Sequence, residues 1–385
     1  LRRRGWQLSR ALIARGVVEI IPRTARGASV RVNVDLQDDF SMDQTLSLYL
    51  LETLPLLERV SPTYALDVLT LVESILENPE LILRKQLDRI KDRAIAQMKA
   101  DGVEYERRME ELEKLEYPKP LRDFVYDTFN AFADKHPWVG EENIRPKSIA
   151  REMFEQFRSF AEYILDYDLQ RSEGLLLRHL HSAYKVLVQT VPESAKTDEV
   201  REMELYLRTL LRQVDSSLED EWERMRNPAY QPLGVATPGG ERLPPPGADQ
   251  AEADVTHDTR AFTAAIRTRL FTFLRAWSIG DLTAALEALQ GAPAHEPAEW
   301  TAERLKAARE RYRAEHDGVR LDPEGRNLRH THVAVATDRR AWQVEQVLVD
   351  AEGLNDWMAV FDVDLDASRR AGEPLLTLRS LGPIA

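Results

Sequence analysis

The chain has 385 residues, no cysteine and a formal net charge of −13 at pH 7. Its length accommodates two or three domains with cores of their own, and the lack of thiols excludes disulfides, cysteine nucleophiles and zinc–thiolate sites. The acidic balance excludes a surface that is basic throughout, so a nucleic acid would have to bind a local basic patch.

The first ten residues, LRRRGWQLSR, are basic but lack the apolar core and the cleavage site of a signal peptide, and they do not begin with Met. No run of about eighteen apolar residues occurs in the sequence, so we expect no membrane span. We therefore expect a piece of a longer protein that works in the cytoplasm without a membrane partner.

The N-terminal stretch combines a short helix, two strands and an excess of arginine. Residues 6–15 have an amphipathic helical pattern, and residues 17–21 and 29–36 alternate as two strands around a basic turn that holds Arg23 and Arg26. A winged helix ends in this order, with the basic loop as the wing that contacts nucleic acid, and a hairpin packed on the next domain is the equal alternative.

The next segment is predicted to form a helical bundle. Apolar side chains recur there with helical period, and proline or glycine separates the segments. The expected helices cover residues 43–57, 63–76, 79–115 with a break at Gly102, 121–134, 149–167, 171–190 and 198–224, and a loop is expected over residues 136–148. Burial of the apolar rows at about 25 cal/mol per Å² would hold this bundle together.

The stretch RSEGLLLRHLHSAYKVLVQT, residues 171–190, is the most informative helix of the bundle. Ser172 is placed to cap it, and its two faces differ in polarity. The apolar row is Leu176, Leu180, Ala183 and Leu187, and the polar stripe is Arg178, His181, Ser182, Lys185 and Gln189. The pattern alone favours a stripe that faces water, but cations and hydrogen-bond donors in one row can also contact a polyanion.

Composition changes sharply over residues 227–258, which are rich in proline and glycine, so we expect a linker there. Beyond it, helices are expected over residues 260–277, 281–289 and 299–316, and strands over residues 331–336, 341–349, 356–365 and 375–381. Helices followed by an antiparallel meander make an α+β domain. This order resembles the cone-shaped fold of nuclear-transport-factor-like and ketosteroid-isomerase-like domains, and we expect protein contact there rather than catalysis.

Sequence motifs for catalysis or metal binding are absent. The sequence has no phosphate-binding GxxxxGK[ST] loop, no nucleophile elbow, no dinucleotide-binding glycine motif and no HExxH, so we expect no catalytic residue and no ATP site in it. Asp362, Asp364 and Asp366 alternate with apolar residues, as on a half-exposed antiparallel strand. We expect no metal site there.

Two histidine pairs are further candidates for a metal. His179 and His181 are two apart on a predicted helix and therefore point in different directions. His330 and His332 would face the same way at the start of a strand, but no third ligand is evident near them. We expect structural or surface roles for both pairs and no metal in this chain.

Residues 173–190, EGLLLRHLHSAYKVLVQT, resemble the ratchet helix of Ski-type RNA helicases, in which a Glu-Gly pair opens the helix. Nearly the whole chain resembles the region that bacterial DEAD/DEAH-box helicases carry after their motor, the domain of unknown function numbered 3516. This resemblance rests on the phrases SPTYALDVLTLVESILENP, QMKADGVEYERRMEELE, PKPL, HPW, SEGLLLRHLHSAYKVLVQTVP and RQVDSSLEDEWE.

The resemblance implies a region that follows two RecA-like motor domains. It places Arg178, Ser182 and Lys185 on the side of the ratchet helix that faces nucleic acid, and we add His181 to this set. ATP and Mg²⁺ would be needed only in the motor domains, so we expect no cofactor here.

The predicted fold is mainly α: the end of a winged helix (1–38), a ratchet-type helical bundle (39–226), a Pro/Gly-rich linker (227–258) and a small α+β domain (259–385). The predicted function is a non-motor accessory region of an ATP-dependent RNA helicase, which contacts single-stranded RNA or DNA behind the RecA-like core of the same parent chain. The alternative is a protein scaffold that self-associates or recruits a nuclease through the α+β domain and binds no nucleic acid.

Overall fold

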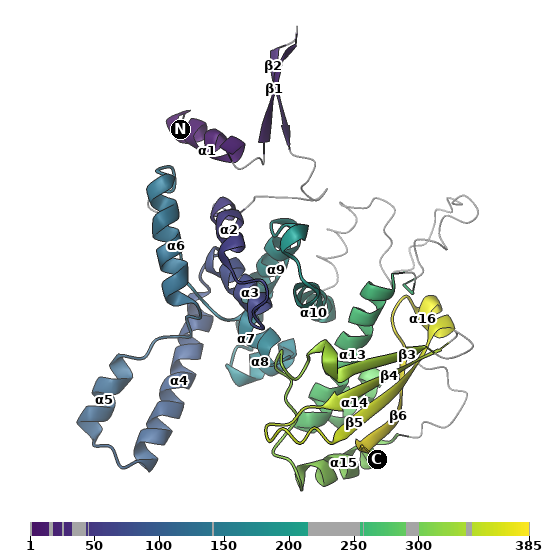
Figure 1. Cartoon of the computed structure of the whole chain (residues 1–385). Coiled ribbons are helices and arrows are strands. Elements are labelled where there is room, and N and C mark those ends of the chain that lie inside the picture. The colour runs from purple at the N-terminus through teal and green to yellow at the C-terminus, as the bar shows by residue number, and fades with distance from the viewer. Residues whose placement is uncertain are drawn as a thin grey trace. The chain divides into compact units, whose positions relative to one another are not determined.

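The computed structural model describes residues 2–14, 18–24, 27–32, 44, 46–140, 142–214, 255–256, 258–289, 300–335 and 341–384. The protein is mainly helical and ends in a small four-stranded antiparallel sheet, which confirms the predicted fold class (Figure 1). The chain forms two compact units, Leu1–Met153 with Ser159–Tyr230 and Phe154–Arg158 with Gln231–Ala385. Within the described ranges, no helix is both long and apolar enough to span a bilayer.

The N-terminal segment has the predicted order of helix, strand and strand. Helix α1 covers Arg2–Ala14, and strands β1 (Val18–Thr24) and β2 (Gly27–Val32) pair antiparallel, with Val18 opposite Val32. The hairpin is confirmed, whereas its role as the wing of a winged helix stays a prediction.

Short helices and one long helical hairpin build the first unit. Its elements are α2 (Ser47–Thr53), η1 (Leu54–Leu56), α3 (Tyr64–Ser74), α4 (Glu80–Ala100), α5 (Tyr105–Glu113), α6 (Arg122–Lys135), α7 (Ala150–Glu155), α8 (Phe160–Asp166), α9 (Glu173–Gln189), η2 (Glu193–Ala195) and α10 (Asp198–Val214). The predicted break between α4 and α5 is confirmed at Gly102, whose φ of 70° lies in the left-handed region that glycine adopts without strain.

The single helix predicted over residues 149–167 is wrong, because the chain forms α7 and α8 there. Phe157 has a φ of 49°, which ends the helical path. Ser159 then starts α8 with a capping box: its hydroxyl accepts the Glu162 N–H at 3.2 Å, and the Glu162 carboxylate accepts the Ser159 N–H at 2.7 Å. These two hydrogen bonds favour a new helix start over a continuous helix.

Helices α3, α9 and α10 pack together and form the centre of the first unit. The predicted apolar row of α9 is fully buried, as are apolar side chains of the two neighbouring helices. These residues are Leu176, Leu180, Ala183 and Leu187 on α9, Val68, Leu69 and Val72 on α3, and Met203 and Leu207 on α10. Each large apolar side chain removed from water in this way contributes roughly 1.5–3 kcal/mol.

The second unit combines helices with an antiparallel sheet of strand order β3-β4-β5-β6. Its elements are α13 (Thr259–Ile279), α14 (Leu282–Leu289), α15 (Ala302–Arg313), η3 (Leu328–His330), β3 (Thr331–Val335), β4 (Ala341–Leu348), β5 (Trp357–Asp364), α16 (Leu365–Ala371) and β6 (Leu376–Pro383). The three predicted helices and the predicted meander of four strands are confirmed. The linker predicted over residues 227–258 lies almost entirely outside the described residues.

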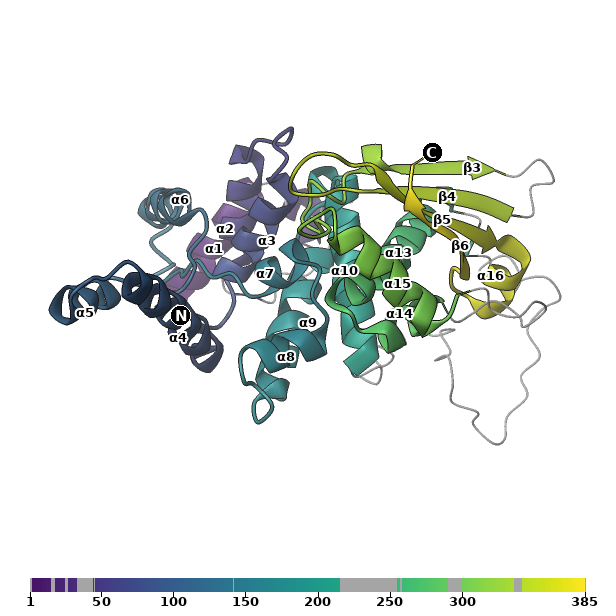
Figure 2. The same cartoon turned by 90° about the horizontal axis from the view of Figure 1, so that it is seen from below.

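One face of the sheet packs on the helices of the second unit, and α13, α14 and α15 lie on that side of it (Figure 2). Aromatic side chains form this core. Phe273 of α13 meets Phe361 of β5 at 5.6 Å between ring centroids, and Tyr312 of α15 meets Trp357 of β5 at 5.2 Å. Both pairs are edge-to-face, the arrangement that the charge distribution of aromatic rings favours.

The strand predicted over residues 356–365 is shorter than expected at its end. Asp364 accepts the N–H of Ala367 at 2.9 Å and thereby caps α16, so Asp366 lies in that helix and not on the strand. The alternation predicted for the strand itself is confirmed by buried Phe361 and Val363 with half-buried Asp362 between them.

Candidate nucleic-acid interface

Helix α9 holds four of the six predicted nucleic-acid-binding residues, and the structure separates them by exposure. Arg178 is exposed, whereas His181, Ser182 and Lys185 are half-buried. Gln189, which we expected on the polar stripe, is buried with 8% of its surface exposed. It lies in the last turn of α9, where the chain turns through η2 into α10, and α10 packs back on α9.

Arg178 makes no hydrogen bond or ion pair with the part of the chain that the structure describes. Its guanidinium stays charged at every physiological pH and presents five N–H donors in a planar fork, which matches a phosphate. By contrast, His181 and Lys185 each interact with another residue of the chain. Arg178 is therefore the position on α9 that is ready to accept an anionic ligand.

The residue beside Arg178 fixes the opposite side of the helix. His179 is buried, and its Nε2 lies 2.9 Å from Oε1 of Glu73 on α3, which is also buried. Because a carboxylate accepts hydrogen bonds, the Nε2–H is the donor. The expectation that His179 has a structural role agrees with this contact, which ties α9 to α3.

Glu73 joins a third helix to this pair. Its carboxylate accepts the backbone N–H groups of Ile149 at 2.9 Å, Ala150 at 2.8 Å and Arg151 at 3.0 Å. These are the first N–H groups of α7, which have no partner within the helix, and a negative charge at that end is favourable. One buried carboxylate thus holds α3, α7 and α9 in a fixed arrangement.

Lys147 completes the polar cluster from the loop before α7. Its ammonium is buried and donates to the backbone oxygens of Glu73 at 2.6 Å and Leu76 at 2.8 Å, at the end of α3. Burial lowers the pKa of Lys147 to about 8, and the nearby Glu73 carboxylate opposes part of this shift. A cation is well placed there, because the last carbonyl groups of a helix carry partial negative charge.

Sequence reasoning did not find Glu73 or Lys147. The available signal was a glutamate within the apolar run LDVLTLVESIL, where every neighbour on the same side was expected in the core. A carboxylate at such a place is buried only when several donors meet it, so it indicates a polar network. The partners themselves lie far away in the sequence and follow no pattern.

The two remaining predicted residues belong to the N-terminal hairpin. Arg23 lies in β1, but its side chain is outside the described part of the structure, and Arg26 lies outside the described residues altogether. Their contact with nucleic acid stays a prediction.

The structure thus defines a class: a mainly helical protein with a small α+β unit and an exposed cation on a rigidly held helix. The chain belongs to the family described as "Domain of unknown function (DUF3516)", whose model matches residues 1–381. No curated protein matches the chain, and no solved structure matches it.

Proposed function

We propose that this protein is the non-motor accessory region of an ATP-dependent RNA helicase and that it contacts single-stranded nucleic acid along α9. The observation that carries the proposal is the pairing of Arg178 with its neighbour. Arg178 is exposed and has no partner within the described residues, while His179 locks the helix to α3 from the buried side. A cation on a rigid support binds a phosphate with little loss of conformational entropy.

The polar stripe supplies further contacts beside Arg178. Lys185 follows about 10 Å further along the helix axis, at 1.5 Å per residue, so the two cations can meet different phosphates of one strand. Ser182 and His181 lie between them and add a hydroxyl and an imidazole. Such a row follows the backbone of a strand and reads no sequence, which suits a protein that moves nucleic acid irrespective of its sequence.

The resemblance to helicases that carry this domain assigns the remaining roles. ATP binding, Mg²⁺ and hydrolysis belong to RecA-like domains of the parent protein, and Arg23 and Arg26 act as secondary contacts on the wing. The protein works in the cytoplasm beside its motor.

The test is binding of a fluorescently labelled single-stranded RNA at low salt, measured by anisotropy. The Arg178→Ala plus Lys185→Ala variant is expected to bind roughly tenfold to a hundredfold more weakly, because each charge-assisted hydrogen bond contributes about 1.5 kcal/mol. The slope of log affinity against log salt should fall by roughly 1, since fewer counterions are released.

A matched control removes two cations elsewhere in the same unit. Arg93 and Lys99 are exposed on α4, so the Arg93→Ala plus Lys99→Ala variant has the same net charge as the test variant. It should retain the wild-type affinity. Equal affinity of the wild type and both variants would show that α9 does not contact the strand.

The scaffold alternative has less support from the second unit. The outward positions of the sheet carry Gln343 and Glu345 on β4 and Asp362 on β5, and Arg379 of β6 lies 3.7 Å from the Asp362 carboxylate. A polar face of this kind is typical of a surface in contact with water, whereas stable self-association favours an apolar centre.

A further inference from the structure

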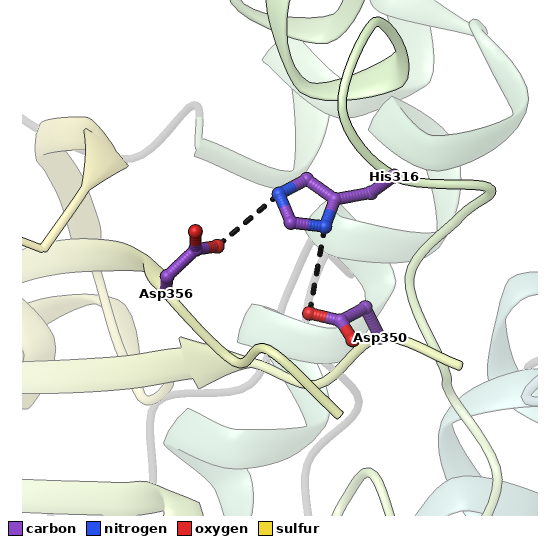
Figure 3. A group of neighbouring side chains, drawn as sticks. All are labelled: His316, Asp350 and Asp356. Atoms are coloured by element: carbon purple, nitrogen blue, oxygen red, sulfur yellow. Dashed lines mark ion pairs between the residues drawn. The ribbon is translucent and has the colours of Figure 1, made fainter. Parts of the chain in front are cut away.

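Three ionisable side chains meet at one end of the sheet in the second unit (Figure 3). His316 follows α15, Asp350 follows β4 and Asp356 precedes β5. One ligand atom from each residue can be chosen so that all three atoms lie within 4.8 Å of one another. Within the described residues this is the group of histidine and carboxylate side chains that could hold a metal ion.

His316 lacks the hydrogen bonds that a buried imidazole needs. It is 4% exposed, and its ring stacks on Tyr312 at 4.5 Å between centroids. Nδ1 lies 3.5 Å from Oδ2 of Asp350 and Nε2 lies 3.1 Å from Oδ1 of Asp356. Neither contact has hydrogen-bonding geometry, so both ring nitrogens are buried without a hydrogen-bond partner. An orphaned buried polar group of this kind indicates a ligand.

Asp350 is fixed and ionised beside this ring. The Asp350 carboxylate accepts the N–H groups of Leu354 at 2.9 Å and Asn355 at 2.7 Å. Burial raises the pKa of Asp350, but the hydrogen bonds from Asn355, Leu354 and Gly353 outweigh it together with the charge of His316, so the pKa is lowered. The orientation of the carboxylate is therefore set before any ligand arrives.

The surroundings of the imidazole are negatively charged. Burial is the main cause that raises the pKa of Tyr312, and the carboxylates of Asp350, Glu352 and Asp356 raise it further. A phenol that resists ionisation because of three nearby anions reports a negative potential at the ring stacked on it. Such a potential favours a cation.

We propose that His316, Asp350 and Asp356 bind one divalent transition-metal ion. Two ligands of a tetrahedral zinc ion lie about 3.4 Å apart, because each bond is about 2.0–2.1 Å long. The distance of 3.5 Å between Nδ1 of His316 and Oδ2 of Asp350 fits such an ion. An imidazole ligand favours Zn²⁺ and related ions over Mg²⁺ and Ca²⁺, which prefer oxygen ligands alone.

Asp356 is the ligand that moves. The two carboxylates face different ring nitrogens, and Asp350 is held by backbone N–H groups, so the ion sits beside Nδ1 and Asp356 turns toward it. The Asp356 side chain is 53% exposed, which leaves it free to turn and leaves a fourth position of the ion open to water. The site is independent of the interface on α9.

The experiment measures zinc in the full chain, purified with a tag that contains no histidine. After dialysis against micromolar Zn²⁺, the wild type should hold one equivalent by mass spectrometry of the metal. Asp356→Asn should bind at least tenfold more weakly, and His316→Gln should retain less than a tenth of an equivalent. His332→Gln is the control, because His332 is exposed on β3 outside the site and should leave the stoichiometry unchanged.

A second readout uses Co²⁺ in place of zinc. The wild type should develop visible absorption of a four-coordinate site, and Asp356→Asn should lose it while its circular dichroism stays that of the wild type. Because Asp356 is half exposed, this variant remains informative even where the buried His316→Gln variant does not fold. Zinc content that is equal in the wild type and in Asp356→Asn overturns the proposal. So does a wild type that binds no zinc, in which case His316 is a protonated bridge between two carboxylates.

Discussion

Two buried histidines, one in each unit, lie beside carboxylates, and their hydrogen bonds differ. His179 bonds to Glu73 at 2.9 Å, and the same carboxylate accepts three backbone N–H groups. His316 lies close to two carboxylates and has no hydrogen bond to either. Proximity of opposite charges is therefore a poor guide to role. A cluster whose donors and acceptors are all paired holds the fold, whereas an unpaired one has capacity for a ligand.

The largest effect should come from removing the carboxylate that satisfies the first cluster. Glu73→Ala leaves the N–H groups of α7 and the imidazole of His179 buried without an acceptor, so we expect the free energy of unfolding to fall by about 3–5 kcal/mol. Urea unfolding followed by circular dichroism measures it. The control is Glu80→Ala, whose side chain is 66% exposed and should cost less than about 1 kcal/mol. A loss as small as that of the control would show that Glu73 does not hold the three helices.

The next effect is a dependence of stability on pH that Lys147 confers. Its pKa is about 8 in the folded protein and 10.5 when unfolded, so the unfolded chain binds more protons between these values. The contribution to the free energy of unfolding is fully present above pH 10.5 and is lost as the pH falls through 8, a change of about 3 kcal/mol at 1.36 kcal/mol per pKa unit.

Comparison with Lys147→Met isolates this contribution from other titrating groups. The difference in free energy of unfolding between the wild type and the variant should rise from pH 7.5 to pH 10, as measured by urea unfolding in buffers of equal ionic strength. A difference that is constant over this range would contradict the lowered pKa.

The smallest effect separates the two faces of α9. His179→Ala should lower the free energy of unfolding by about 2 kcal/mol, because it removes a buried hydrogen bond and packing. Arg178→Ala should change stability by less than about 0.5 kcal/mol but should weaken RNA binding. Thermal unfolding and anisotropy on the same two samples test both statements. If Arg178→Ala destabilises the fold as much as His179→Ala, the arginine is structural.

The sequence predicts the elements whose signal is periodic. Helix α9 and the four strands of the second unit appear where the apolar periods place them, because the period follows directly from which face is buried. The split between α7 and α8 was missed, since Phe157 in the left-handed region is a choice that tertiary packing imposes on a residue with no preference for it. Gln189 was misplaced because the path of the chain after a helix decides what covers its last turn.

The candidate sites show the same limit. The exposure of Arg178 follows from helical spacing alone and could be predicted. The polar clusters could not, because Glu73 meets Arg151 and His179 across 78 and 106 residues of sequence, and the ligands around His316 come from three separate segments. Single residues of common type at irregular spacing carry no local signal.

The separation of Glu73 from His179 also has a consequence for synthesis on the ribosome. At about 5–20 residues per second, His179 is made roughly 5–20 s after Glu73, since 106 residues separate them. During that interval α3 has neither its apolar neighbours nor the donors for its carboxylate, so the nascent chain exposes Leu69 and Val72 to whatever surrounds the exit tunnel. The first unit becomes able to close only when α9 has left the ribosome, which makes the N-terminal half of the bundle a candidate client for chaperones that bind nascent chains.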